Sequence, residues 1–234
     1  MQIRGGRGYE TALSLQGRGE EPIPVERMMR DARINTIFEG SSEIMRLFIA
    51  REALDPHLKA AGNVLNTKLS FGKRFIAGIK ALGFYGVWYP KQLWPFAFTA
   101  GSGLDPKLRR HVRWARRRTR RLARRLFHAM VTNGPALERE QILLGDFVDI
   151  GTELFAIAAT CSRAQAMIND GTPRSEVLPL AEFFCNETRS KIDRSFAHLR
   201  RNNNRAGYRV ARSILDGNYP WLENGLVKWD PSSE

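Results

Sequence analysis

Histidine and cysteine, the side chains that most often bind metals or act as nucleophiles, are scarce in this sequence. The four histidines are scattered, at positions 57, 111, 128 and 198, and neither cysteine has a partner at metal-ligand spacing. The sequence therefore excludes the zinc motifs of known spacing. The cysteines, Cys161 and Cys185, lie inside apolar helical patterns, and we expect them to be buried, reduced thiols.

Long apolar runs are also missing. No stretch reaches the ~18 uninterrupted apolar residues that a membrane-spanning helix requires. Glu10 interrupts the first residues before an apolar core can form, so the sequence predicts no signal peptide. It shows no convincing strand alternation and no internal repeat, which leaves helical periodicity as the main structural signal.

Acidic residues are few, with 24 Asp and Glu against 37 Lys and Arg and a net charge of +13. This charge predicts affinity for anionic partners such as phospholipid, the phosphates of CoA or nucleic acid. Residues 64–101 contain no acidic residue and interleave basic residues with Trp, Tyr and Phe. Such a composition suits a membrane interface, where rings settle at headgroup depth. The alternative is a loop, broken by glycines and prolines, whose rings pack on the protein's own core.

Basic residues are concentrated in one run, with 11 Lys and Arg between Lys107 and Arg125. Apolar residues keep helical spacing within the run, which therefore predicts an amphipathic helix with one basic and one buried face. A solvated basic face is the simplest interpretation, and binding of anionic lipid is the second. Nucleic-acid binding ranks third, because no zinc finger, KH loop or RNP motif accompanies the charge.

The predicted fold class is all-α, with three long amphipathic helices in an antiparallel bundle. Beside the basic helix, which Asn133-Gly134-Pro135 ends, the periodicity predicts helices at 25–34, 137–168, 177–199 and 206–215. Another begins at Ser41 or Ser42 and should fade near Asp55-Pro56. Thr172 is the expected cap of the 177–199 helix, with Pro173 at its first position. The glycine-rich residues 1–24 are predicted to be loop.

The segment from residue 34 to residue 51 is the most informative about function. Glu39 follows the apolar pair Ile37-Phe38 and precedes Gly40. A carboxylate in this setting is partly desolvated, which raises its affinity for a proton, and the glycine leaves room for a ligand to come close. The alternative is a carboxylate that only favours the positive end of the following helix.

Several motifs stand in a fixed order around Glu39: Gln2–Tyr9, Pro24–Arg27, Arg30–Ile34 and Glu39–Ser41. They fit the order Gln-x-x-Gly-Gly-x-Gly-Tyr/Phe, Pro-x-Glu-Arg/Lys, Arg-Asp-x-x-Ile and Glu-Gly-Thr. Residues 1 to about 52 thereby resemble the carboxy-terminal end of the flavin-dependent acyl-CoA dehydrogenases. Two departures are Ser41, which replaces Thr and keeps the hydroxyl, and an extra stretch around Thr11–Glu21.

The resemblance implies an α,β-dehydrogenation in which Glu39 is the base. Glu39 would take the α proton of an acyl thioester while a hydride passes from the β carbon to FAD. The backbone N–H of Glu39 matches a donor to the thioester carbonyl, and Gly40 lets the substrate lie close.

The resemblance also implies two groups of FAD-binding residues. Ser41, Ser42 and Glu43 match positions near the flavin, although Glu43 can also be read as a carboxylate that stabilises the helix amino terminus. The second group matches the segment that holds the adenosine diphosphate part of FAD, shared across a dimer: Gln2, Ile3, Arg4, Gly5 and Gly6. Backbone N–H groups of a glycine-rich turn suit a pyrophosphate, and Arg4 adds positive charge.

The second half of the chain resembles the very-long-chain subfamily, through Gly103–Pro106, Glu140–Leu144, Asp149–Ala156 and Cys161–Ala164. This implies conversion of long-chain acyl-CoA to trans-2-enoyl-CoA in fatty acid β-oxidation. It also implies a homodimer, an electron-transfer flavoprotein as acceptor, and an anionic membrane surface as a partner. The implied location is the cytoplasm or the mitochondrial matrix, peripheral on the inner membrane.

Three regions are expected: the carboxy-terminal part of a catalytic domain (1–60), an aromatic and basic linker that can associate with a membrane (61–103), and a helical extension domain (104–234). The β domain that shapes most of a flavin site in this family has no counterpart here. We therefore expect a piece of a longer enzyme that is inactive alone. The alternative is a catalytically inactive membrane-binding or scaffold protein derived from the family.

Overall fold

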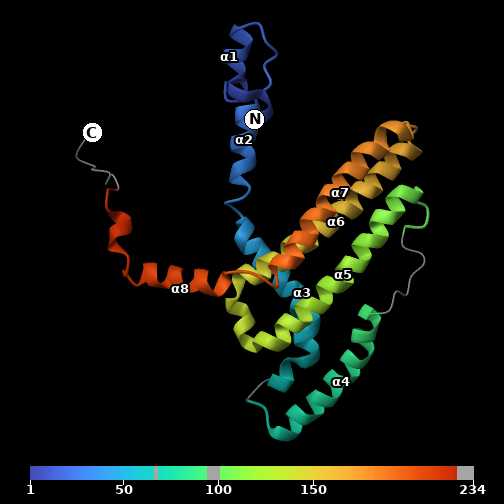
Figure 1. Ribbon diagram of the computed structural model, residues 1–234, viewed down its shortest axis with the longest axis vertical. Coiled ribbons are helices and arrows are strands. Elements are labelled where there is room, and N and C mark those ends of the chain that lie inside the picture. Colours follow the sequence, from blue (N-terminus) through green and yellow to red (C-terminus); the bar gives the residue numbers. More distant parts are fainter. Residues whose placement is uncertain (66–67, 94–100, 226–234) are drawn as a thin grey trace.

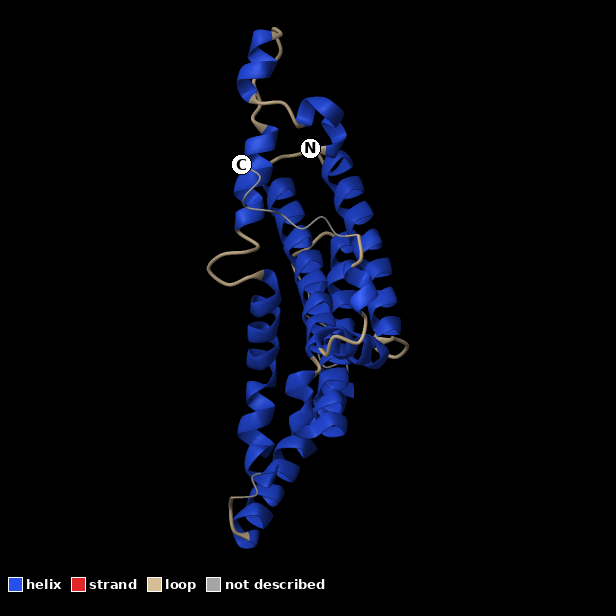
Figure 2. Ribbon diagram, turned by 90° about the vertical axis from the view of Figure 1, so that its left-hand side faces the viewer, coloured by secondary structure: helices blue, strands red, loops and turns tan. Residues whose placement is uncertain are grey.

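The structure, a computed structural model, describes residues 1–65, 68–93 and 101–225 (Figure 1). Its α-helices are α1 (Ala12–Gly17), α2 (Val25–Ile34), α3 (Ser42–Leu65), α4 (Phe71–Leu93), α5 (Pro106–Asn133), α6 (Gln141–Asn169), α7 (Arg174–His198) and α8 (Asn204–Leu215). Three 3-10 helices accompany them: η1 (Gln2–Gly8), η2 (Gly134–Arg139) and η3 (Pro220–Glu223). The described residues contain no strand (Figure 2), which confirms the all-α fold class.

Helices α5, α6 and α7 pack together as an antiparallel bundle, as predicted (Figure 1). The apolar faces of the three helices meet in a first core: Leu108, Trp114, Ala115, Ile150, Leu154, Ile157, Cys161, Ala164, Val177, Leu178, Ala181, Cys185, Ile192 and Phe196. Both cysteines are buried there as free thiols, as expected. Burial of one large apolar side chain of this core, such as Ile157 or Phe196, stabilises the fold by roughly 1.5–3 kcal/mol.

A second core joins α3 to the bundle. Its members come from α3, α5, η2 and α6: Ala50, Leu54, Leu126, Leu137, Leu144, Phe147 and Val148. Helix α6 therefore contributes side chains to both cores and is the only helix besides α5 to do so among the described residues. The expected borders at 60/61 and 103/104 stay a prediction, but α3 and the carboxy-terminal bundle share buried side chains.

Three predicted helix ends were wrong. The helix expected from Leu137 begins only at Gln141, because η2 (Gly134–Arg139) precedes it. Helix α3 continues past Asp55-Pro56 to Leu65, because the buried Leu54 and His57 hold the turns on both sides of the proline. Tertiary packing there outweighs the cost of the missing N–H. At the start of α7, Pro173 occupies the N-cap position and the helix begins at Arg174, so Thr172 is not the cap.

Helix α4 replaces most of the expected aromatic linker. It is continuous over 23 residues, although it contains four glycines and Pro90, because it packs along α3 and against α5. In its second half the aromatic rings pack on the protein's own core, as the alternative interpretation of this segment expected. Tyr85 and Trp88 surround the ring of His57 and contact Phe127. The remaining aromatic residues of the stretch, Trp94, Phe96 and Phe98, lie outside the described residues.

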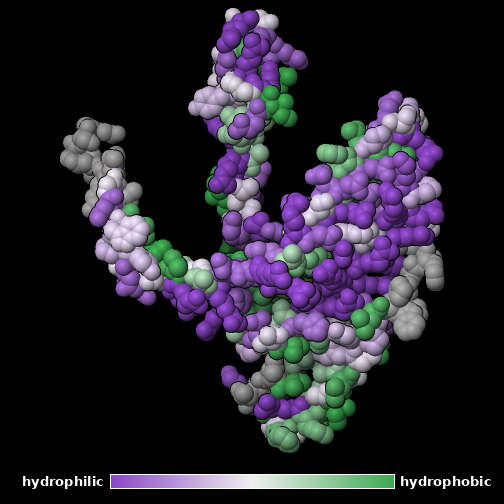
Figure 3. Space-filling view, viewed as in Figure 1, coloured by the Kyte–Doolittle hydropathy of each residue, from purple (hydrophilic) through white to green (hydrophobic). Residues whose placement is uncertain are grey.

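The first half of α4 presents an apolar stripe to solvent. Its residues recur every three or four positions, which places them on one face of the helix: Phe71, Phe75, Ile79 and Leu82, all exposed. Figure 3 shows hydrophobic residues gathered along α4, whereas hydrophilic residues dominate the visible surface of α5–α7. No helix in the described part of the chain is long and apolar enough to cross a membrane.

Residues 1–24 were predicted to be loop but contain η1 and α1. The Thr11 hydroxyl oxygen accepts a hydrogen bond from the Ser14 N–H at 3.3 Å and caps α1, and Leu15 is fully buried within this small unit. Together with α2 it forms an amino-terminal arm that projects from the bundle (Figure 1). Helix α8 projects in another direction, with the Tyr208 hydroxyl accepting a hydrogen bond from the Ile142 N–H at 3.0 Å.

Candidate active site

Glu39 lies in the turn that links α2 to α3. Backbone hydrogen bonds close this turn on itself: the Phe38 N–H donates to the Ile34 carbonyl at 3.1 Å, and the Ser42 N–H donates to the Thr36 carbonyl at 3.3 Å. At its tip Glu39 has a φ of 53° and Gly40 a φ of 106°. Glu39 is the only residue other than glycine with a positive φ in the described part of the chain.

A left-handed conformation costs free energy at a residue with a Cβ atom, and such residues cluster at functional sites. The φ of Glu39 therefore supports a functional role for the turn, and this support does not depend on the sequence motif. A Cβ atom at Gly40 would lie 3.0 Å from the Met45 Sδ, so the Met45 side chain would have to shift by a few tenths of an ångström, and the φ of Gly40 itself favours glycine. The geometry turns the Glu39 backbone outward, and no described residue accepts a hydrogen bond from its N–H.

The side chain of Glu39 is open to solvent among the described residues. Glu39, Gly40 and Glu43 are exposed, whereas Ser41 and Ser42 are partly covered. The partial desolvation expected from the apolar neighbours is absent among the described residues, because Ile37 and Phe38 are themselves exposed. Removal of water from Glu39 would have to come from a part outside those residues.

The hydroxyl residues after Gly40 begin helix α3, as predicted. The Ser41 side-chain oxygen accepts a hydrogen bond from the Ile44 N–H at 3.4 Å. Glu43 stands in the first turn of α3, where a negative charge is favourable. This position suits the helix-terminus interpretation of Glu43 and leaves its expected place near a flavin a prediction.

The second expected group, residues 2–6, lies in η1. Gln2, Ile3, Gly5 and Gly6 are exposed, and Gly5 has a φ of 56° with open space where a Cβ atom would point. The Arg4 Nη1 atom is buried and has no hydrogen-bond partner among the described residues. A guanidinium and the exposed backbone of a glycine turn in the same 3-10 helix have the chemistry that binds a phosphate group. The residues present are thus compatible with the pyrophosphate of FAD.

The two groups are not brought together within the chain. Helix α2 separates them, with η1 near its first residue and the Glu39 turn at its end (Figure 1). Ten helical residues span about 15 Å. The two expected groups therefore do not meet within the described part of the chain.

Sequence reasoning missed the environment of His57. Its ring is buried and stacks on Tyr85 at a centroid distance of 5.8 Å, with the His57 Nδ1 3.2 Å from the Tyr85 hydroxyl. Burial lowers the pKa of His57 and raises the pKa of Tyr85. The partners stand 28 positions apart, so local patterns held no signal of this pairing.

An apolar groove of about 300 Å³ beside α3 was missed as well. Residues of three helices line it: Ile49, Ala50, Ala53, Leu122, Leu126, Phe147, Val148, Gly151, Thr152 and Phe155. Each helix pattern predicted an apolar face, but the space left between the faces depends on how the helices cross. In the described residues, no group of three His, Cys, Asp or Glu side chains is arranged to hold a metal ion.

Comparison with known families places both halves of the chain. Residues 1–54 match the family described as "Acyl-CoA dehydrogenase, C-terminal domain". Residues 106–217 match "ACAD9/ACADV, C-terminal domain". The segment between the two matches contains α4 and its exposed apolar stripe.

Individual relatives agree with these matches. The probable acyl-CoA dehydrogenase FadE10 of Mycobacterium tuberculosis is 46% identical over 235 residues, which cover 97% of this chain and 35% of the relative. The mitochondrial very long-chain specific acyl-CoA dehydrogenase of Homo sapiens is 31% identical over 207 residues, which cover 85% of this chain and 29% of the relative. The chain thus spans about a third of the length of the curated relatives it matches.

Proposed function

The chain belongs to the acyl-CoA dehydrogenase family, of whose members it represents carboxy-terminal domains, and from this we propose that it serves a flavin-dependent acyl-CoA dehydrogenase with Glu39 as the base. The observation that supports this role is the turn at Glu39, where a residue with a side chain adopts a positive φ next to a glycine. The proposed reaction converts a long-chain acyl-CoA to a trans-2-enoyl-CoA in fatty acid β-oxidation.

In this proposal the Glu39 carboxylate accepts the α proton of the acyl thioester. The Glu39 backbone N–H, which no described residue occupies, donates a hydrogen bond to the thioester oxygen as negative charge develops there. Gly40 leaves the approach to that N–H free of a side chain. Because Glu39 is exposed in this chain, the remainder of the enzyme has to exclude water before the carboxylate can become a strong enough base.

FAD, when bound, supplies the acceptor for the hydride that leaves the β carbon. Ser41, Ser42 and Glu43 would lie on the flavin side of the Glu39 turn. Arg4 would pair with the pyrophosphate of FAD, with the exposed turn at Gly5 and Gly6 leaving the backbone accessible.

The separation of the two groups by α2 supports a homodimer in this proposal. If residues 2–6 lie about one α2 length from Glu39, they reach the adenosine diphosphate of a flavin held by the second copy. An electron-transfer flavoprotein is the proposed electron acceptor of the enzyme. The enzyme would work in the cytoplasm or the mitochondrial matrix, at the membrane surface.

The change Glu39→Gln in the full-length enzyme tests the role of the carboxylate. Gln keeps the shape of the side chain but cannot accept the proton, so the dehydrogenation rate should fall by at least about 100-fold. The measurement is the single-turnover rate of flavin bleaching on mixing with a long-chain acyl-CoA.

Glu52→Gln is the matched control, because Glu52 is an exposed glutamate of α3 with no proposed role. It should bleach at the wild-type rate. Flavin content has to be equal in the three proteins, so that a lost cofactor is not mistaken for a lost base. An unaltered rate in Glu39→Gln would remove Glu39 from the mechanism.

We further propose that the apolar stripe on α4 attaches the enzyme to an anionic membrane. The stripe of Phe71, Phe75, Ile79 and Leu82 faces solvent, and the helix carries Lys and Arg without any acidic residue. Exposed rings flanked by cations are suited to the headgroup region of a bilayer.

The paired change Phe71→Ser and Phe75→Ser should lower partitioning into phosphatidylglycerol vesicles by about tenfold or more, because two exposed rings lose their apolar surface. Co-sedimentation with the vesicles measures this. The control pair Phe155→Ser and Phe183→Ser also removes two exposed rings, but from α6 and α7. Equal losses in both pairs would show that α4 has no special part in membrane attachment.

One observation favours the alternative of a catalytically inactive membrane-binding or scaffold protein. Among the described residues nothing encloses Glu39, so the chain by itself would lack a dry site. If the chain acts alone in this second role, the purified 234-residue protein should bind anionic vesicles but contain no flavin. Stoichiometric yellow flavin in that preparation would exclude the alternative.

A further inference from the structure

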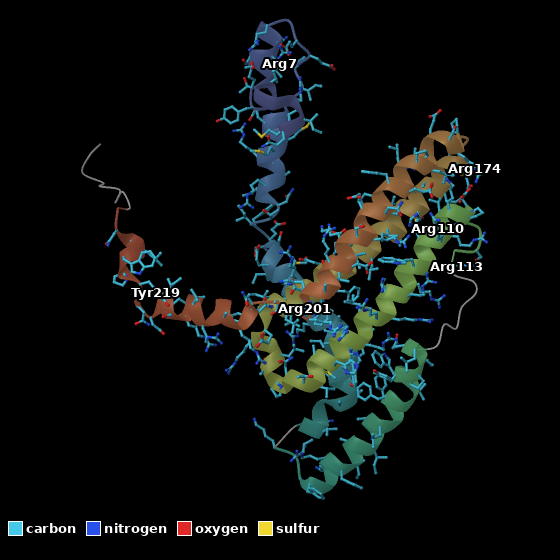
Figure 4. The ribbon with its side chains drawn as sticks, in the orientation of Figure 1. Arg7, Arg110, Arg113, Arg174, Arg201 and Tyr219 are labelled. Atoms are coloured by element: carbon cyan, nitrogen blue, oxygen red, sulfur yellow. The ribbon has the colours of Figure 1, made fainter. Side chains whose placement is uncertain are left out.

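A groove of about 330 Å³ runs along the amino-terminal half of α5, and arginines form nearly all of its lining. The lining residues are Pro106, Arg109, Arg110, Arg113 and Arg117. Steps of three and four residues place them on one face of the helix. Figure 4 labels Arg110 and Arg113, whose side chains extend from the same part of α5. The groove is remote in sequence from the Glu39 turn.

Two of the guanidinium groups are fixed by hydrogen bonds within the fold. The Arg109 Nε donates to the Gly101 carbonyl at 3.2 Å and its Nη2 donates to the Leu104 carbonyl at 2.9 Å. The Arg110 Nη2 donates to the Glu182 carboxylate at 3.2 Å. Because a guanidinium has five N–H groups, each keeps donors for a ligand while its position is held.

The surroundings leave an excess of positive charge at the groove. Helix α5 contains no acidic residue. Two carboxylates of the described residues lie at this end of α5: Asp105, which pairs with Arg174, and Glu182, which pairs with Lys107 and Arg110. Both carboxylates are thus already shared among cations, and four arginines still converge on one groove.

The positive charges of α5 also act on Arg189, which lies across the helix interface on α7. Burial against Trp114, and then the charges of Arg110, Arg118 and Arg117, lower the pKa of its guanidinium, with Asp193 opposing them. Cations that repel one another in this way lose that repulsion when an anion binds between them.

We propose that this α5 groove binds the phosphate groups of a multiply phosphorylated ligand. Guanidinium groups donate paired hydrogen bonds to phosphate oxygens, a geometry that few other anions match. The distance from Arg109 to Arg117 is eight residues of helix, about 12 Å, which is longer than one phosphate group. The groove therefore accommodates several phosphates in a row, from either a soluble polyphosphate or a row of phospholipid headgroups.

Isothermal titration of the full 234-residue chain with inorganic tripolyphosphate, at about 0.15 M salt, tests the proposal. The wild-type chain should bind, and the double change Arg113→Gln and Arg117→Gln should weaken binding at least about tenfold, because it removes charge-assisted hydrogen bonds. Circular dichroism checks that the helix content and the melting temperature of the double variant match those of the wild-type chain.

The matched control is Arg205→Gln with Arg209→Gln. These two exposed arginines have the same spacing on α8, so the control loses the same net charge away from the groove. Its affinity should change by less than about twofold. Equal weakening in both double variants would reduce the effect to net charge and overturn the proposal.

A second measurement needs no variant. Tripolyphosphate should protect the groove arginines from phenylglyoxal, as mapped by mass spectrometry, and leave Arg205 and Arg209 reactive. Absence of protection in the groove would contradict the proposal even if the variants failed to fold.

Vesicles distinguish the two sources of phosphate. If headgroups are the ligand, Arg113→Gln with Arg117→Gln should weaken binding to phosphatidylglycerol vesicles more than the α8 control does. If a soluble polyphosphate is the ligand, the vesicle affinities of the two variants should be equal. Binding of a DNA duplex, with neither tripolyphosphate nor vesicles bound, would overturn the proposal in favour of a nucleic-acid surface.

Discussion

His111 lies on α5 without any exposed surface, and neither of its ring nitrogens has a hydrogen-bond partner among the described residues. Burial, and then the positive charges of Arg189 and Arg110, lower its pKa, whereas Glu182 of α7 raises it less. The neutral ring is therefore the form that the fold accommodates. An unsatisfied buried polar group costs about 1–3 kcal/mol in mutational measurements.

The lowered pKa links His111 to the pH dependence of stability. Below its unfolded pKa of about 6.5, the unfolded chain binds a proton that the folded chain resists. The contribution of His111 is therefore fully present above that pH and is lost as the pH falls toward the folded pKa. His57, whose pKa burial also lowers, contributes in the same direction.

The change His111→Leu should reduce the loss of stability at low pH. We expect the variant to be more stable than wild type by about 1 kcal/mol at pH 7.5, because two unpaired polar atoms leave the core. We also expect a smaller drop in its free energy of unfolding between pH 7.5 and pH 5.5. Urea denaturation followed by circular dichroism at the two pH values measures both quantities.

Leu126→Ala is the control for the pH series, because it changes a buried side chain of α5 that does not titrate. It should retain the wild-type pH dependence. A His111→Leu variant with an unchanged pH dependence would show that the His111 ring is not held neutral by the fold.

The candidate site could be predicted from sequence only where its residues are contiguous. The Glu39 turn was found because Phe38, Glu39 and Gly40 are neighbours whose chemistry can be read directly. The positive φ of Glu39 and its exposure depend on how α2 meets α3, which no local pattern encodes. The α5 groove was seen only as a run of charge, because its shape depends on Gly101 and Glu182, outside α5.

At the scale of the elements, burial and not residue type determines what α6 contributes to stability. Ile157 has 0% of its surface exposed in the first core, whereas Phe155, two positions away, is 74% exposed. Ile157→Ala should lower the free energy of unfolding by about 2–5 kcal/mol, because it leaves a cavity. Phe155→Ala should change it by no more than about 0.5 kcal/mol.

Chemical denaturation of the two alanine variants measures this difference. The comparison is stringent because removal of the larger side chain, Phe155, is predicted to cause the smaller change in the free energy of unfolding. Similar losses for both variants would mean that Phe155 is covered in solution, for instance by another part of the enzyme over the groove that it lines.

Helix ends were predicted correctly where the helix-breaking residues in the sequence coincide with the end of the packed helix. The basic helix α5 ends at Asn133, and Gly134 follows with a φ of 52°. The residues Asn133-Gly134-Pro135 predicted this end. Helix prediction failed for α4 and for α3 at Pro56, because glycine and proline penalties were read without the aromatic contacts that offset them. The partners of those contacts, such as Phe127 for Tyr85, come from a different helix and are invisible to a local window.

At the scale of the whole molecule, stability should be unevenly distributed. The amino-terminal arm and α8 project from the bundle (Figure 1) and take no part in either core. Segments with few buried contacts open at low free energy and are cleaved first. Limited trypsin digestion should therefore cut at Arg18 and near Arg200 and Arg201 before it cuts within α5, despite the many arginines of that helix.

Mass spectrometry of early digestion products identifies those cuts. Digestion in urea serves as the control, since the arginines of α5 should become substrates once the bundle unfolds. Early cleavage inside α5 under native conditions would contradict the assignment of α5 to the stable part of the molecule.

Helix α6 supplies Phe147 and Val148 to the core that seats α3, and Ile157 and Cys161 to the core of the bundle. The extension is therefore not a detachable appendage: without it, Ala50 and Leu54 would face water. Residues of α3 and α6 that meet in this core should vary together among relatives, and a destabilising substitution deep in α6 should also loosen the start of α3, next to Glu39.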